Sequence, residues 1–235
     1  MNPNLQAELR RFLADEERLS AALLSSGYQG SAYLFDDGGA HRLVVKTAGG
    51  GTLTGWFHRM MLRREGHAYQ LLRDVAGVPH SPGMLDEQHL LLEYIDGESL
   101  KDERDELQNA DIFYARLRRV ISDIHAAGVA HGDLKRKANV LVTRNNEPVV
   151  IDFGTAVTRN GSFIDQMLFP LLRRFDDNAW IKAKYARNYS AIAPEDLHWY
   201  QPTIVERVFQ LILRVWRTLT FRRARKRRSQ SKIQK

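Results

Sequence analysis

A short apolar hairpin near the middle of the chain constrains the fold most, because polar residues flank it. The apolar runs Val140–Val142 and Val149–Ile151 flank a segment that contains Asn145-Asn146, which favours a tight turn between two strands. Asp133 and Asn139 precede the first run, and Asp152 follows the second. Polar side chains at the ends of neighbouring short strands can converge, and we expect these three to do so.

The residue types in this pattern suit a hard cation. Carboxylate and amide oxygens are the ligands that Mg2+ prefers, and a metal held in this way can bridge ATP phosphates and neutralise charge during transfer. A carboxylate that is not a ligand can orient an attacking hydroxyl group and accept its proton.

The motifs around these residues resemble those of the protein-kinase-like superfamily. His131-Gly132-Asp133 is similar to its catalytic-loop motif, and Ile151-Asp152-Phe153-Gly154 to its metal-binding DFG motif. Either tripeptide alone would be an ordinary turn or strand end. Together they imply ATP and Mg2+ as cofactors, with Asp133 as the catalytic base and Lys135 at the transferring phosphate. Asn139 and Asp152 would hold Mg2+.

The loop departs from the family pattern at one point. The family places the asparagine five positions after the aspartate, whereas Asn139 follows Asp133 by six. The loop therefore has one extra residue within its basic run Lys135–Lys137. Asn139 can reach the metal if this loop bulges.

An ion pair is expected upstream of these motifs. Lys46 ends an apolar strand, as the phosphate-binding lysine of the superfamily does, and Glu65 falls in the next predicted helix. Glu65 shares one helix face with apolar residues at three- and four-residue offsets. A buried carboxylate needs a partner, so we expect Lys46 to pair with Glu65. The alternative is that both are ordinary surface side chains.

Two further segments resemble nucleotide-binding parts of the superfamily. Gly27, Gly30 and Ser31 lie where its glycine-rich loop belongs, and glycines let backbone N–H groups approach phosphate. The full G-x-G-x-x-G pattern is absent. Glu93 and Ile95 lie in a segment similar to the hinge between lobes, where backbone groups would contact adenine; the alternative is a plain strand end.

The order of elements predicts an α+β protein, with strands and one inserted helix followed mostly by helices. The resemblance implies a bilobal protein-kinase-like fold with an antiparallel N-terminal sheet lobe and a short helical C-terminal lobe. We assign residues 1–95 to the nucleotide-binding lobe with its leading helix, 96–202 to the catalytic helical lobe, and 203–235 to an amphipathic helix and basic tail. Apolar spacing predicts a leading helix over about Leu5–Leu24, capped by Asn4, and a helix over Asp111–Ala127 whose core face includes Ile112.

The region after the second motif is too short for a eukaryotic-type kinase lobe. Ala193-Pro194-Glu195 spells the motif that closes the substrate segment of such kinases, but it lies far from Asp152 and few residues follow it. We interpret Pro194-Glu195 as the first turn of a helix. Over about Gly27–Phe175 the chain resembles the compact branches of the superfamily, namely bacterial lipopolysaccharide-core (Kdo or heptose) kinases and RIO-like serine/threonine kinases.

Charge is distributed unevenly along the chain. Arg207–Lys235 contains eleven Lys or Arg and no acid, more than the net charge of +7 of the whole chain. An amphipathic helix followed by such a cluster suits an anionic membrane surface, although the segment could equally pack on the C-lobe. Nucleic acid is an unlikely partner, because no basic groove with interleaved aromatics is evident. The absence of cysteine, of a signal peptide and of an apolar span predicts a cytoplasmic protein, peripheral on the inner membrane.

Three functions remain open at this point. The leading hypothesis is phosphorylation of a sugar hydroxyl of lipopolysaccharide core at the cytoplasmic membrane face. The second is a RIO-like protein serine/threonine kinase, which Lys135 after Asp133 favours. The third is a pseudokinase that acts as a binding module, supported only by the shifted Asn139.

Overall fold

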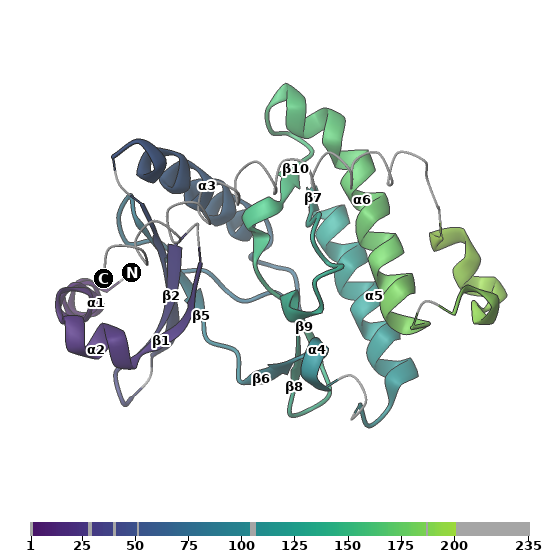
Figure 1. Cartoon of the computed structure of the whole chain (residues 1–235), viewed down its shortest axis with the longest axis horizontal. Coiled ribbons are helices and arrows are strands. Elements are labelled where there is room, and N and C mark those ends of the chain that lie inside the picture. Colours follow the sequence, from purple (N-terminus) through teal and green to yellow (C-terminus); the bar gives the residue numbers. More distant parts are fainter. Residues whose placement is uncertain are drawn as a thin grey trace, which may run out of the picture.

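The computed structural model describes residues 2–27, 30–39, 41–50, 52–103, 107–186 and 188–200. It has two parts: a sheet flanked by α1, α2 and α3, and a second part dominated by α5 and α6 (Figure 1). The α+β class predicted from the sequence is confirmed. The predicted amphipathic helix and basic tail over 203–235 lie outside the described residues.

The first part is a five-stranded antiparallel sheet in the order β1-β2-β3-β5-β4. Its strands and the helix α3 inserted between β3 and β4 are β1 Leu23–Ser26, β2 Gly30–Asp36, β3 Arg42–Ala48, α3 Thr52–Leu71, β4 Gly83–Met84 and β5 His89–Glu93. Helices cover both faces. Leu91 packs with the α1 side and Leu90 and Leu92 with the α3 side, which explains why this strand is continuously apolar.

The single leading helix predicted over Leu5–Leu24 is wrong. The chain forms α1 (Pro3–Ala14), α2 (Glu16–Ala21) and then β1. Asp15 is extended, and its side chain accepts a hydrogen bond from the backbone of Arg18, so it starts a new helix instead of continuing the first. The cap of α1 is Asn2, whose side chain accepts from the backbone N–H of Asn4, the predicted cap.

The second part contains the predicted hairpin and two long helices. Its elements are β6 Gly97–Ser99, α4 Leu100–Glu103, α5 Ala110–Ala126, β7 Val129–Ala130, β8 Val140–Thr143, β9 Pro148–Val150, β10 Val157–Thr158 and α6 Phe163–Lys184. β8 and β9 pair in an antiparallel hairpin, with β6 beside β8, and β7 pairs with β10. Pro194 begins a 3-10 helix over Pro194–Trp199, which agrees with the predicted helical first turn.

The helix expected over Asp111–Ala127 is present as α5, but Ile112 does not face the core. Its side chain is 47% exposed, because the inward stripe of α5 runs through Phe113, Leu117 and Ile121 instead. That stripe joins α3, β5 and α6 in one apolar core that spans both parts of the molecule. No helix in the described part of the chain is both long and apolar enough to cross a membrane.

Candidate active site

Lys46 pairs with one carboxylate from each part of the molecule. On β3 it alternates with Val45, which faces α1, so its side chain projects toward α3. Its Nζ donates to Oε1 of Glu65 on α3 at 2.5 Å and to Oδ1 of Asp152 at 2.9 Å. The predicted ion pair between Lys46 and Glu65 is therefore present, and Asp152 from the second part joins it.

Charge pairing outweighs the cost of burial for Lys46 and Asp152, but not for Glu65. Burial would lower the pKa of Lys46, but the Glu65 and Asp152 carboxylates raise that pKa above its ordinary value. Burial would raise the pKa of Asp152, yet the Lys46 ammonium holds it below its ordinary value. Burial raises the pKa of Glu65, against the effect of Lys46, so its charge at this buried position depends on its partner.

The backbone at Asp152 turns sharply and is fixed by an aromatic cluster. Asp152 has φ 68° and ψ 68°, a left-handed conformation that non-glycine residues adopt only with support. Its N–H donates to the hydroxyl of Tyr69 on α3 at 3.2 Å. The buried ring of Phe153 packs against two others, with its centroid 5.0 Å from that of Tyr69 and 4.8 Å from that of His131. This packing ties the predicted metal motif to both α3 and the catalytic loop.

His131 holds the catalytic loop against the strand that leads to Asp152. Its Nε2 lies 3.0 Å from the carbonyl oxygen of Ile151, and its Nδ1 accepts from the N–H of Asp133 at 3.2 Å. A carbonyl can only accept, so these two bonds require a neutral imidazole with its proton on Nε2. His131 acts here through orientation of its neighbours.

The extra loop residue is absorbed by a 3-10 turn over Lys137–Asn139. Asn139 is buried, its Nδ2 donates to the carbonyl oxygen of Asp133 at 3.2 Å, and its own carbonyl oxygen accepts from the N–H of Ile151. Asn139 therefore contacts the loop that carries Asp133 and the strand that precedes Asp152, despite the altered spacing.

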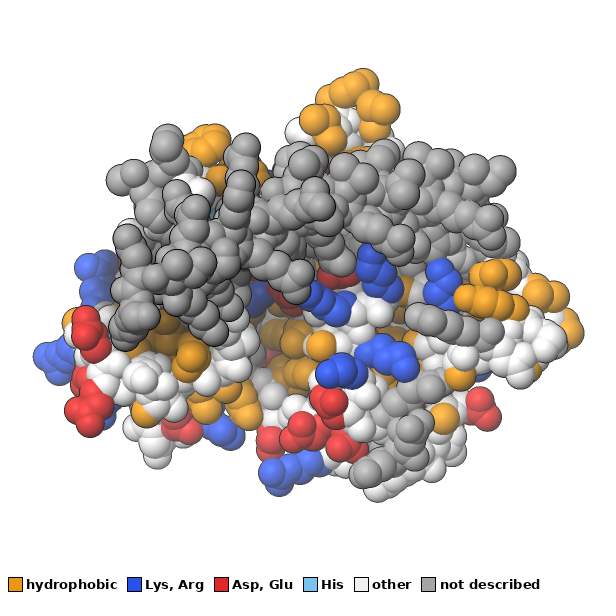
Figure 2. All heavy atoms as spheres, viewed as in Figure 1, with side chains coloured by type: hydrophobic (Ala, Val, Ile, Leu, Met, Phe, Trp, Pro, Cys, Tyr) orange, Lys and Arg blue, Asp and Glu red, His pale blue; other side chains and the backbone are white. Residues whose placement is uncertain are grey.

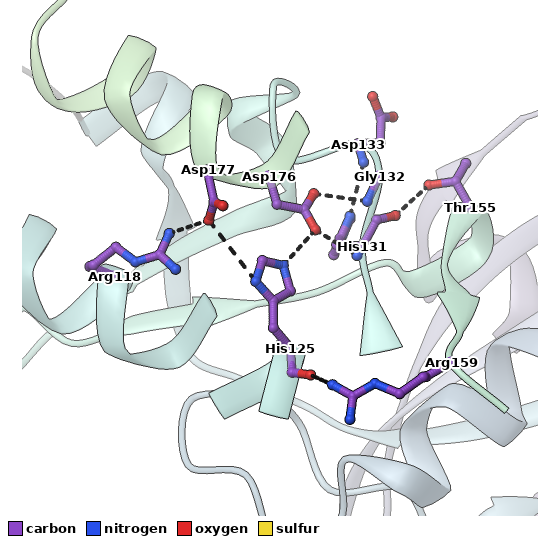
Figure 3. Close-up of polar contacts among 9 residues, drawn as sticks. All are labelled: Arg118, His125, His131, Gly132, Asp133, Thr155, Arg159, Asp176 and Asp177. Atoms are coloured by element: carbon purple, nitrogen blue, oxygen red, sulfur yellow. Dashed lines mark hydrogen bonds and ion pairs between the residues drawn. The ribbon is translucent and has the colours of Figure 1, made fainter. Parts of the chain in front are cut away.

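Asp176 on α6 anchors the same loop and was not predicted from the sequence. Its Oδ2 accepts from the N–H of His131 at 2.8 Å, and its Oδ1 from the N–H of Gly132 at 2.9 Å (Figure 3). The side chain of His125 lies 3.1 Å from Oδ2, and Asp176 is fully buried. One signal could have revealed it: Asp176 lies on the apolar stripe of its helix with Phe169 and Leu172, where a charge needs buried partners.

The two remaining predicted loop residues differ in exposure: Asp133 is buried and Lys135 is exposed. The Asp133 carboxylate points away from the cluster around Asp176 (Figure 3), and its nearest ion partner, Nε of the well-exposed Arg136, is 3.9 Å away. Lys135 is exposed two residues further on. The loop therefore carries a buried carboxylate and, two residues on, an exposed cation.

The predicted glycine turn lies at the junction of β1 and β2. Gly27 donates its N–H to the carbonyl oxygen of Gly30, and Ser31 donates its hydroxyl to Ser26 at 3.2 Å. At Gly30, φ is 152° and an added Cβ would lie 1.9 Å from the carbonyl oxygen of Thr47, so only glycine fits there.

The predicted hinge residues lie at the end of β5, where Glu93 is its last residue, and just beyond it. The N–H and carboxylate of Glu93 both bond to the backbone of His80, at 2.8 and 3.0 Å. Because its N–H is already bonded, Glu93 would contact adenine through its carbonyl group. Ile95 follows, half-buried, before β6 begins.

The donor set fits Mg2+ that arrives with a nucleotide. Asp152 supplies carboxylate oxygens, and Asn139 has its amide oxygen left after its Nδ2 bonds to Asp133. Two protein oxygens are too few for an octahedral ion, so phosphate and water oxygens would complete it. No cluster of three or more His, Cys, Asp or Glu side chains that could hold a metal ion occurs among the described residues.

A comparison with protein families identifies the domain. The model of the RIO domain matches residues 55–174, about half of the chain, from the first turn of α3 to the middle of α6. The comparison with curated proteins gave no match. The matched range includes Glu65, Asp133, Asn139 and Asp152, and the chain belongs to the RIO-domain family of atypical, protein-kinase-like phosphotransferases that use ATP.

Proposed function

We propose that this protein transfers the γ-phosphoryl group of ATP to a hydroxyl group, with Asp133 as the catalytic base. The observation that carries this proposal is the continuous network from Lys46 and Glu65 through Asp152 to the loop of Asp133. In that network each charged group has a counter-charge, and the two parts of the molecule meet where a nucleotide would lie.

Residues of the first part bind and orient the nucleotide in this proposal. Lys46 contacts ATP phosphates, and Glu65 holds its ammonium group in place at 2.5 Å. The turn containing Gly27, Gly30 and Ser31 covers the phosphates, while backbone groups at Glu93 and Ile95 contact adenine. Residues 1–95 thus form the nucleotide-binding lobe and residues 96–202 the catalytic lobe.

Residues of the second part act on the transferred group. Asn139 and Asp152 hold Mg2+, which when bound neutralises charge on the phosphates. Asp133 accepts the hydroxyl proton as the acceptor oxygen bonds to the γ-phosphorus; the bond from that phosphorus to the β–γ bridging oxygen breaks and ADP leaves. Lys135, exposed two residues from the base, offers a positive charge to the phosphoryl oxygens.

The acceptor that fits best is a serine or threonine hydroxyl of a protein. Membership of the RIO-domain family and the lysine at position 135 both favour it. A second candidate acceptor is a sugar hydroxyl of lipopolysaccharide core at the inner membrane. The sequence of residues 203–235 favours it, because an apolar periodicity followed by a basic cluster suits an anionic membrane surface. The contact of Asn139 with Asp133 counts against a pseudokinase.

Turnover of ATP with Mg2+ tests the proposal, using purified protein alone, with a generic protein acceptor and with lipopolysaccharide core. We expect phosphate on serine or threonine, and a loss of at least about a thousandfold in Asp133→Asn and Asp152→Asn. Asp123→Asn, on the exposed face of α5, is the matched control. Phosphate transferred only to the lipopolysaccharide would select the sugar acceptor. Unchanged turnover in Asp133→Asn would refute Asp133 as the base, and wild-type protein without ATP binding would refute phosphotransfer.

A further inference from the structure

The first turns of α6 present large apolar side chains to solvent. Phe163, Ile164 and Met167 are 76%, 65% and 64% exposed. This end of α6 projects beyond β7 and β10 (Figure 1), and Figure 2 shows hydrophobic side chains standing out at the same place. We call these three residues the α6 tip.

The α6 tip is held in position by the opposite face of the same helix. Asp165 forms a capping box with Ser162 and pairs through Oδ1 with Nη2 of Arg64 on α3 at 2.5 Å. Phe169, one turn further, is buried against β7 and β10. Asp165 and Phe169 therefore fix the first turns of α6, and the exposure of the tip is a property of the fold.

The outward surface of the tip carries no charge. Between Gly161 and Pro170 the only ionisable residue is Asp165, which is buried and paired. Cations follow at the exposed positions Arg173 and Arg174. An uncharged apolar protrusion beside cations differs from an ordinary solvated helix face, which carries charges throughout.

A basic pocket of about 610 Å3 lies between α3 and this segment. It is lined by Arg59, Arg63 and Arg64, and the exposed ring of Trp56 also contributes to it. Its carboxylates are Asp165, paired with Arg64, and Glu87, which lies 2.6 Å from Arg63. The three arginines therefore exceed the two carboxylates, and the pocket has an excess of positive charge. Asp165 belongs both to the pocket lining and to the helix turn of the tip, so the two features adjoin.

We propose that the α6 tip and the adjoining pocket bind an anionic membrane surface: the tip enters the interfacial region of the bilayer, and the pocket takes the phosphate of a lipid headgroup. Charge complementarity selects this occupant. Exposed aromatic and aliphatic side chains on a convex protrusion gain burial in lipid, and the adjoining cations gain attraction to anionic headgroups. The inference deepens the proposed function, because it places phosphoryl transfer beside a bilayer, and to that extent it rests on the proposed function.

Co-sedimentation of the full chain with vesicles tests the inference. The vesicles consist of phosphatidylcholine with or without phosphatidylglycerol. In the tip variant, Phe163→Ser, Ile164→Ser and Met167→Ser are combined, and we expect its binding to phosphatidylglycerol vesicles to fall by about tenfold or more. Leu23→Ser with Leu24→Ser is the matched control, because these β1 side chains are 46% and 49% exposed in the other part of the molecule. This control should bind as the wild type does.

A second variant tests the pocket without touching the tip. Arg59→Glu should weaken binding to phosphatidylglycerol vesicles and leave binding to pure phosphatidylcholine unchanged. The inference would be overturned if the tip variant bound vesicles as the wild type does, with an unchanged melting temperature. The C-terminal basic segment or a protein partner would then explain the chain's positive charge. Equal wild-type binding to both vesicle types would overturn the role of the pocket.

ATP binding measured without vesicles separates this inference from the proposed function. The tip variant should bind ATP as the wild type does, since its three residues do not touch the candidate active site. Vesicle binding by a protein that fails to use ATP would refute phosphotransfer and retain the membrane surface. A protein that uses ATP but does not bind anionic vesicles would refute the membrane surface and retain phosphotransfer.

Discussion

The two loops of the candidate active site are held in opposite ways. The catalytic loop over 131–139 is buried at both ends and is fixed from outside by Asp176 and by Ile151. The turn around Gly27 and Gly30 is held by a bond within itself and by the strands that it joins. In the proposed function the first loop keeps a base and a metal ligand in place, whereas the second only has to bring backbone N–H groups near phosphate.

The difference teaches where side-chain identity matters. In the catalytic loop, the bonds to Asp176 depend on that particular side chain, and a wrong side chain there leaves buried N–H groups without an acceptor. In the glycine turn, what matters is the absence of a side chain at Gly30, and the serine hydroxyl is an addition. We therefore expect substitutions to have effects that decrease from the first loop to the second.

Among substitutions of the residues that hold the two loops, the largest effect is expected for Asp176→Asn. An amide replaces one of the two carboxylate oxygens, so either His131 or Gly132 faces a donor instead of an acceptor. We expect a loss of roughly 2–4 kcal/mol in the free energy of unfolding and about a hundredfold slower phosphoryl transfer per folded molecule, measured by denaturation and single-turnover kinetics.

Asp177→Asn is the matched control for Asp176. Asp177 is the next residue of α6, and its Oδ1 lies 2.6 Å from Nη1 of Arg118 on α5 and 4.0 Å from Nδ1 of His125. The substitution weakens these pairs and leaves the bonds from Asp176 to His131 and Gly132 in place. Stability should fall, while the rate per folded molecule should not. Equal slowing in both variants would show that the loop is not specifically anchored by Asp176.

A smaller effect is expected for Asn139→Leu. The substitution removes the bond to the Asp133 carbonyl group and the proposed metal oxygen. We expect the Mg2+ concentration needed for half-maximal turnover to rise by roughly ten- to a hundredfold. Asn139→Asp retains an oxygen ligand and should retain most of the Mg2+ affinity. Unchanged Mg2+ dependence in Asn139→Leu would mean that the extra loop residue has displaced Asn139 from the metal.

Gly30→Ala tests the second loop. Its Cβ would lie 1.9 Å from the carbonyl oxygen of Thr47, so β2 must move away from β3. We expect a loss of roughly 1–3 kcal/mol in the free energy of unfolding and about tenfold weaker ATP binding by titration calorimetry. Gly27→Ala is the matched control, because an added Cβ there meets no heavy atom within 4 Å. Equal losses in both variants would contradict the steric explanation.

The smallest effect is expected for Ser31→Ala. The hydroxyl donates to Ser26 at 3.2 Å in an exposed position, and such a bond contributes little. We expect the KM for ATP to rise by about two- to threefold. Ser26→Ala removes the partner and keeps the Ser31 hydroxyl, so it should leave KM unchanged. A much larger rise in Ser31→Ala would mean that the turn depends on side chains as the catalytic loop does.

The hairpin and its flanking polar residues could be predicted from the sequence because their signals are local. Alternation of apolar residues, turn residues and the spacing of Asp133 from Asp152 lie within one stretch of chain. The Lys46–Glu65 ion pair was also within reach, since a carboxylate on the inward face of a helix needs a partner. Local signals failed in the leading helix, because the Asp15 side chain caps a second helix there. They also failed at Ile112, which lies in the first turn of α5 and outside the core.

By itself, the sequence determined the α+β class, the residues of the candidate active site and the uneven distribution of charge. Only the tertiary structure decided how the catalytic loop is held and which surface is exposed. Asp176 reaches His131 across 45 residues of chain, and Arg64 reaches Asp165 across 101. The exposure of the α6 tip likewise depends on what packs around the helix start. Such contacts arise when separate helices dock, and no local pattern encodes the distance between two side chains that meet only through packing.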